Sequence, residues 1–130
     1  MIKNYWHFIL PAVIILGIVG YISVTDGDSG QQINTAQLAE LIEQDKEDIY
    51  FLDVREDHEF KEGHIEGMSN VPLSKLDKEY SQIPKDKTIV VICRSGKRSL
   101  QAVSKLKDYG YNDLINVNGG MLEWDGKRIR

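Results

Sequence analysis

The only cysteine in the chain stands in a stretch whose residue types suit nucleophilic chemistry on an anion. Cys93 is followed by Arg94-Ser95-Gly96-Lys97-Arg98-Ser99. A helix amino terminus presents backbone N–H groups without intrahelical partners, and such groups bind anions. If this run forms a tight turn at Gly96 before a helix, the helix dipole and the three cations favour a thiolate over a thiol at Cys93. The stretch therefore predicts a nucleophile for anionic substrates.

The charges around the cysteine support this prediction. The chain of 130 residues carries a formal charge of -4, from 16 Lys and Arg against 20 Asp and Glu. The segment from Lys87 to Lys107 nevertheless contains six cations and no acid. Such a local field attracts anionic ligands. The alternative is that Cys93 is only a small buried hydrophobic residue, and the cations and glycine that follow it weigh against that interpretation.

The length of the cysteine loop separates two chemistries. Tyrosine-phosphatase-like enzymes place five residues between the cysteine and an arginine, which makes a loop wide enough for a tetrahedral phosphate. Here four residues separate Cys93 from Arg98, and Ser99 takes the later position. The tighter loop suits a smaller group, such as the outer sulfur of a persulfide. This spacing disfavours a phosphatase or an arsenate reductase.

Two apolar segments are expected to position the chemistry-bearing residues. Thr88 to Ile92 directly precedes Cys93, and Ile49 to Leu52 directly precedes Asp53. Strands that are apolar on both faces and alternate with helices indicate an α/β fold, with a mainly parallel sheet covered by helices on both faces. Ligands bind beyond the carboxyl ends of such strands. Cys93 and Asp53 are therefore expected at the same edge of the sheet.

Further helices and strands are predicted around this sheet. A capping-box pattern at Asn34 and Gln37 begins a helix that ends near Asp45. Another helix follows the cysteine turn, with Leu100, Val103 and Leu106 as its apolar positions, and ends at Gly110. The remaining predictions are helices at 57–62 and 75–80, strands at 70–72 and 114–117, and a short helix after Gly119-Gly120 that bears Trp124.

The order of these motifs resembles the single-domain branch of the rhodanese family. The resemblance covers nearly all of the region from Ile33 to Trp124 and combines several short motifs with the cysteine loop. These motifs are Asp53-Val54-Arg55 with Glu59-Phe60, Gly63-His64-Ile65 with Gly67, Asn70-Val71-Pro72, and Gly119-Gly120 with Trp124. Met68 stands where the family commonly has alanine.

The resemblance implies a sulfurtransferase that works through a persulfide on Cys93. The donor is a small anionic sulfane-sulfur compound such as thiosulfate, and the acceptor is a thiol, or cyanide in an assay. The backbone amides from Arg94 to Ser99 are expected to stabilise the persulfide, with Arg98 closing the loop and Lys97 helping to bind the donor. No cofactor is implied. A non-catalytic module that binds a partner or carries persulfide sulfur remains an alternative.

Supporting roles are expected for residues after the first apolar segment. Asp53 is expected to cap local backbone amides, and Arg55 to form an ion pair with Glu59. His64 is interpreted as a packed, hydrogen-bonded residue. It is not interpreted as a metal ligand, because no partner set with ligand spacing exists.

The amino-terminal region is predicted to be a membrane anchor. No Asp, Glu, Lys or Arg occurs from Asn4 to Thr25, and about 20 helical residues span a bilayer. We expect a single-pass anchor at 1–25, a linker at 26–32 and the rhodanese-like domain at 33–130. Lys3 before the span and two aspartates after it place the domain outside the cytoplasm. A cleaved signal peptide is the alternative.

Bulk composition excludes two other classes of protein. A pI near 5.3 argues against nucleic-acid binding, which requires a basic face. A single cysteine excludes a disulfide scaffold.

Overall fold

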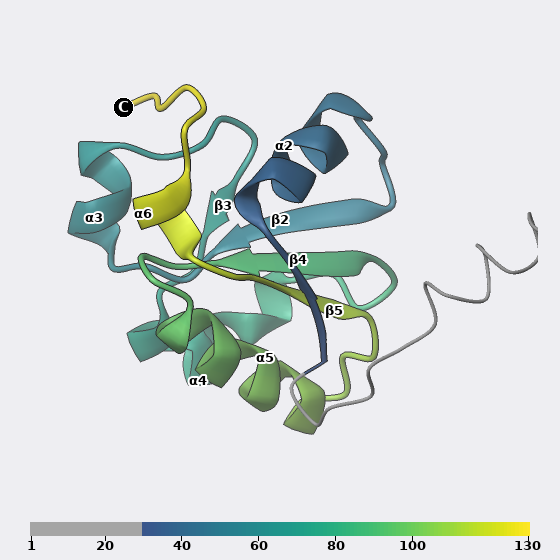
Figure 1. Ribbon diagram of the computed structural model, residues 1–130. Helices are drawn as coiled ribbons and strands as arrows, with labels where there is room; N and C mark the ends of the chain where they lie inside the picture. The colour runs from purple at the N-terminus through teal and green to yellow at the C-terminus, as the bar shows by residue number, and fades with distance from the viewer. Residues whose placement is uncertain (1–29) are drawn as a thin grey trace, which may run out of the picture.

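A five-stranded parallel sheet forms the centre of the molecule in a computed structural model that describes residues 30–130 (Figure 1). The strand order is β1-β5-β4-β2-β3, and every pairing is parallel. The strands are β1 (Gln31–Ile33), β2 (Ile49–Asp53), β3 (Ser69–Asn70), β4 (Thr88–Ile92) and β5 (Leu114–Val117). The predicted α/β class with a parallel sheet is confirmed.

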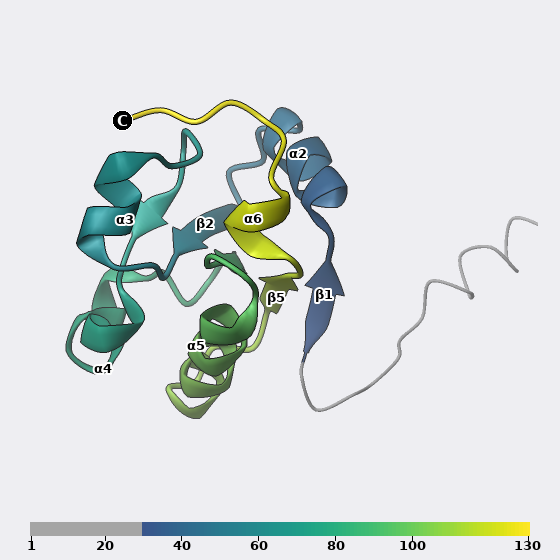
Figure 2. The ribbon, with the colours of Figure 1, turned by 60° about the vertical axis from the view of Figure 1, so that its left-hand side comes forward.

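Helices cover both faces of the sheet, as Figures 1 and 2 show. On one face lie α4 and α5, and on the other lie α2, α3 and α6. The helices are α2 (Thr35–Glu43), α3 (Asp57–Glu62), α4 (Leu76–Glu79), α5 (Lys97–Asp108) and α6 (Gly120–Glu123), with 3-10 turns at Leu73–Lys75 and Tyr80–Gln82. The predicted capping box begins α2, because Asn34 Oδ1 accepts from Gln37 N and Gln37 Oε1 accepts from Asn34 N, both at 2.8 Å.

The central strand β4 joins the two halves of the core. Ile89 and Val91 point to the face with α4 and α5, and Val90 and Ile92 point to the opposite face. All four side chains are fully buried. Four consecutive apolar residues, Ile89 to Ile92, can all be buried only between two helical layers, which explains why this apolar run predicted the strand well.

Several boundaries differ from the sequence predictions. Strand β1 takes in Gln31 and Gln32, which were assigned to the linker; three residues with two exposed glutamines carry no apolar pattern. On α5, Leu100 is 38% exposed, whereas Val103 and Leu106 are buried. Leu100 therefore does not lie on the buried face of α5. The segment predicted as one helix at 75–80 is α4 flanked by the two 3-10 turns.

The predicted membrane anchor at 1–25 lies outside the described residues. Across residues 30–130, every helix is too short or too polar to cross a bilayer.

Candidate active site

The carboxyl ends of β2 and β4 bring the two predicted centres together. Asp53 pairs in register with Ile92, the residue before Cys93. The backbone N–H of Val54 donates to Ile92 O at 3.0 Å, so the two chains stay side by side beyond the sheet. The expectation that Cys93 and Asp53 share one edge of the sheet is confirmed.

The loop after β4 folds around the sulfur of Cys93. Gly96 has a φ of 106°, which an L side chain rarely adopts, and it forms the N-cap of α5. Its N–H donates to Cys93 Sγ at 3.0 Å, and Ser99 Oγ lies 3.4 Å from the same sulfur. The Ser99 hydroxyl also donates to Gly96 O at 3.0 Å. The loop therefore supplies a backbone donor to the sulfur, and the Ser99 hydroxyl oxygen accepts from the Cys93 thiol.

Cys93 itself has no exposed surface, although the loop around it reaches the solvent. Arg94, Ser95 and Lys97 are exposed, whereas Gly96 and Ser99 are buried. A donor molecule can therefore reach Sγ only if the atoms that cover it move.

Helix α6 holds the loop from the other side through backbone hydrogen bonds. Met121 N donates to Cys93 O at 2.9 Å, and Leu122 N donates to Arg94 O at 3.0 Å. A Cβ atom at Gly120 would lie 2.5 Å from both of these carbonyl oxygens. The glycine pair that the sequence singled out is thus the place where the α6 backbone approaches the cysteine loop.

A buried ion pair organises the segment that follows β2. Arg55 is 6% exposed and Asp53 is 0% exposed. Arg55 Nε and Nη2 donate to the Asp53 carboxylate at 2.8–3.1 Å, and Asp53 Oδ1 also accepts from Arg55 N at 2.9 Å. Arg55 Nη2 reaches Gly63 O at 2.8 Å as well. The predicted capping role of Asp53 is confirmed, and its carboxylate additionally neutralises Arg55.

Glu59 pairs with the loop arginine, so the predicted Arg55–Glu59 ion pair is wrong. Arg98 Nη1 and Nη2 donate to the two oxygens of Glu59 at 2.6 and 3.0 Å. The Arg98 guanidinium lowers the pKa of Glu59 from 4.5 to about 2, although partial burial opposes the shift. The Arg55 guanidinium is already paired with Asp53, so Glu59 on α3 pairs with Arg98 on α5 instead. The ion pair of Arg98 with Glu59 thus links the start of α5, next to the cysteine loop, to α3.

His64 is a packed residue, as expected. Its ring stacks on Phe60 with centroids 3.7 Å apart, and its Nδ1 donates to Phe60 O at 2.8 Å. Within residues 30–130, no group of three or more His, Cys, Asp or Glu side chains is placed to hold a metal ion.

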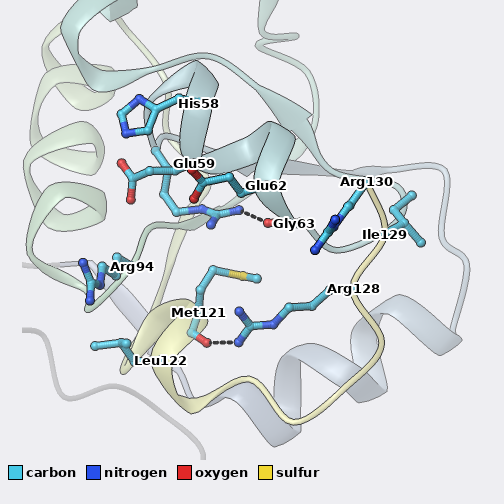
Figure 3. Close-up of a pocket in the computed structure, with 11 residues that line it drawn as sticks. His58, Glu59, Glu62, Gly63, Arg94, Met121, Leu122, Arg128, Ile129 and Arg130 are labelled. Carbon is cyan, nitrogen blue, oxygen red and sulfur yellow. Dashed lines mark hydrogen bonds between the residues drawn. The ribbon is translucent and has the colours of Figure 1, made fainter.

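A pocket of about 780 Å³ opens beside the cysteine loop (Figure 3). Figure 3 shows Arg94 on one side of it, Arg128 and Arg130 on the other, and Met121 between them. The lining residues come from the loop after β2, α3, the cysteine loop, α6 and the carboxyl-terminal segment; they are Arg55, His58, Glu59, Glu62, Gly63, Arg94, Met121, Leu122, Arg128, Ile129 and Arg130.

Sequence reasoning found only part of this pocket. Arg55, Glu59 and Arg94 were predicted site residues and do line it. The contributions of His58, Glu62 and the carboxyl-terminal arginines were missed. They carry no motif, and only the three-dimensional path of the chain brings them to the cysteine loop.

Comparison with known proteins identifies the family. The Rhodanese-like domain family matches residues 34–127, which is most of the chain. The chain belongs to the rhodanese-like domain family. YtwF of Bacillus subtilis is 40% identical over 97 residues, which cover 75% of this chain and 92% of that protein. The thiosulfate sulfurtransferase GlpE of Pseudoalteromonas translucida is 31% identical over 100 residues, covering 73% and 89% respectively.

A solved rhodanese-related structure shows the same fold. The crystal structure of a protein from Thermoplasma volcanium superposes with a TM-score of 0.67 at 34% identity, covering 76% of this chain and 97% of that one. The predicted resemblance to the rhodanese family is therefore confirmed for the region that carries the cysteine loop and the glycine pair.

Proposed function

We propose that this rhodanese-like protein is a sulfurtransferase that carries sulfane sulfur on Cys93, with thiosulfate as a donor. In the first step the Cys93 thiolate attacks the outer sulfur of thiosulfate. The S–S bond of thiosulfate breaks, its electron pair leaves with sulfite, and a new S–S bond forms the Cys93 persulfide. No proton or external electron is required.

The second step returns the enzyme to its starting state. An acceptor thiolate attacks the outer sulfur of the persulfide, the new S–S bond forms on the acceptor, and Cys93 leaves as a thiolate. Cyanide acts in the same way and leaves as thiocyanate. The Gly96 N–H donates to the Cys93 sulfur and supports stabilisation of the anion in both steps. We propose that the first-turn amides of α5, which lack intrahelical partners, do the same.

The observation that carries this proposal is the surroundings of the Cys93 sulfur. The backbone N–H of Gly96 donates to the sulfur of the chain's only cysteine at 3.0 Å, and the Ser99 hydroxyl oxygen lies 3.4 Å away as the acceptor of the thiol. The names of relatives such as the thiosulfate sulfurtransferase above support the same chemistry. A non-catalytic module needs no donor around a cysteine sulfur, so this geometry favours the enzyme.

Mass spectrometry of the intact protein tests the proposal. After incubation with thiosulfate, the wild-type protein should gain the mass of one sulfur atom, and addition of cyanide should remove it as thiocyanate. Cys93→Ser should show neither change, because no other cysteine exists. Ser95→Ala is the matched control, since Ser95 lies in the same loop but is exposed. Absence of any sulfur adduct on the wild type with several sulfane donors would refute the proposal.

We also propose that residues 1–25 tether the domain to a membrane as a single-pass anchor, with the domain outside the cytoplasm. The support is the sequence: 22 residues from Asn4 to Thr25 lack Asp, Glu, Lys and Arg, and about 20 apolar residues are enough to span a bilayer.

A further inference from the structure

The carboxyl-terminal segment Lys127–Arg130, here called the strap, forms one wall of the pocket. His64 N donates to Ile129 O at 2.9 Å, and Ile129 N donates to His64 O at 2.8 Å. Arg128 Nη2 donates to Met121 O at 2.6 Å (Figure 3). These bonds fix the strap between the segment after α3 and helix α6. The family match ends at residue 127, so Arg128 and Arg130 lie beyond the shared domain.

The strap gives the pocket an excess of positive charge. Arg94, Arg128 and Arg130 line the pocket, and none of the three forms an ion pair with a carboxylate of residues 30–130. Two carboxylate side chains line the pocket as well. Glu59 is held by Arg98, which leaves the Glu62 side chain beside three guanidinium groups. Arginine binds carboxylates through paired N–H groups, so the pocket favours a ligand with several carboxylates.

The size of the pocket exceeds what a small donor requires. Pockets of roughly 300–1,000 Å³ hold molecules of drug size, and this one encloses about 780 Å³. Its floor is Met121, whose N–H donates to the carbonyl of Cys93. Arg94 of the cysteine loop also lines the pocket, so a ligand held by the strap lies beside the loop that carries Cys93.

We propose that the pocket selects the acceptor: a small thiol that carries at least two carboxylates, held by Arg128 and Arg130 while its sulfur approaches the Cys93 persulfide past Arg94. This inference rests on the proposed sulfurtransferase function and names the substrate class of its second step. The acceptor thiolate takes the outer sulfur and Cys93 leaves as a thiolate, so the reaction needs no further reactant.

The test compares two acceptors on the full chain. Protein loaded with persulfide and freed of donor is mixed with mercaptosuccinate, which has two carboxylates, or with the neutral 2-mercaptoethanol. The measured quantity is the ratio of the two transfer rates, relative to wild type, so that differences in thiol reactivity cancel. Arg130→Gln and Arg128→Gln should each lower this ratio by about fivefold to tenfold. The matched control Lys127→Gln removes one charge from the same strap outside the pocket and should keep the ratio.

Equal ratios in wild type and both arginine variants, or an equal fall in Lys127→Gln, would overturn the inference while leaving the persulfide chemistry intact. If no persulfide forms, the proposed function fails and the pocket is tested by binding alone. NMR titration of arginine Nε signals with succinate should then show saturable shifts that weaken in Arg130→Gln and persist in Lys127→Gln. Shifts that do not saturate, or that match those with propionate, would overturn the inference.

Discussion

At the scale of single residues, the missing side chain of Gly120 sets how closely helix α6 approaches the cysteine loop. Its φ is 56°, and a Cβ atom there would lie 2.5 Å from two backbone oxygens, those of Cys93 and Arg94. Backbone atoms on both sides cannot retreat without breaking the hydrogen bonds from α6 to the loop. A single methyl group at this position should therefore disturb both stability and the geometry around the sulfur.

We predict that Gly120→Ala lowers the free energy of unfolding by about 2–5 kcal/mol, since it adds overpacking to an unfavourable φ. The rate of persulfide formation on Cys93 should fall as well. Gly67→Ala is the matched control: Gly67 has a φ of 87°, but no atom lies within 4 Å of its added Cβ, so only the backbone cost of about 1–2 kcal/mol remains. Urea unfolding measures both. Equal losses in the two variants would show that contact with the loop carbonyls is unimportant.

Individual site residues were predictable from sequence to different degrees. Cys93 and Gly96 were found because a nucleophile and a tight turn at a helix start have a local signature. The partner of Arg55 was predicted wrongly, because Asp53 and Glu59 are both close to Arg55 in sequence and only the fold decides which of them forms the ion pair. The Arg98 partner on α3 lies 39 residues away in the chain, which no local pattern reveals.

At the scale of elements, the bond between Glu59 and Arg98 links α3 to α5 across the site. The carboxylate has a pKa of about 2 in the folded protein against 4.5 as its ordinary value. Between these two pKa values, the Glu59 carboxyl is therefore protonated in the unfolded chain and ionised in the folded protein. The pair contributes its full stability above about pH 5, and this contribution is lost as the pH falls towards 2.

We predict that Glu59→Gln lowers the free energy of unfolding by about 1–3 kcal/mol at neutral pH and by much less near the acid end of this window. Urea unfolding of both proteins across that pH range measures the difference. Asp57→Asn serves as the control, because its pair with Lys75 is half exposed on the same helix and should matter less. A difference between wild type and Glu59→Gln that does not change with pH would contradict the assignment.

Elements with a strong apolar pattern were predicted well, and the weakly patterned ones were not. Strands β2, β4 and β5 and helices α2 and α5 appeared close to their expected places because burial dictates their sequences. Strand β1 was missed because two of its three residues are exposed glutamines at the sheet edge. Its position is set by pairing with β5, a contact between residues more than 80 apart.

At the scale of the whole molecule, the proposed tether makes a prediction about topology. If residues 1–25 anchor the chain with the domain outside the cytoplasm, protease added to intact cells should digest the domain. If the orientation is reversed, the domain lies in the cytoplasm, and protease should digest it only after the membrane has been opened. A chain that lacks its first 25 residues and appears in the soluble fraction would instead indicate the cleaved signal peptide.

The overall architecture followed from sequence, but the pocket did not. The alternation of buried strands and helices is a repeated local signal, and it predicted the parallel sheet and the edge that carries Cys93. The pocket arises where α3, α6 and the strap meet, and its arginines at 128 and 130 have neighbours far away in the chain. Such surfaces have no periodicity to detect.

The direction of β1 has a consequence for how the protein faces its surroundings. All five strands are parallel, so the carboxyl ends of β2 and β4, with Asp53 and Cys93, share one edge, and Gln31 begins β1 at the opposite edge (Figure 2). Whatever precedes Gly30 is joined to the molecule at that opposite edge. The cysteine loop therefore lies at the far edge of the sheet from the point where the preceding chain joins the domain.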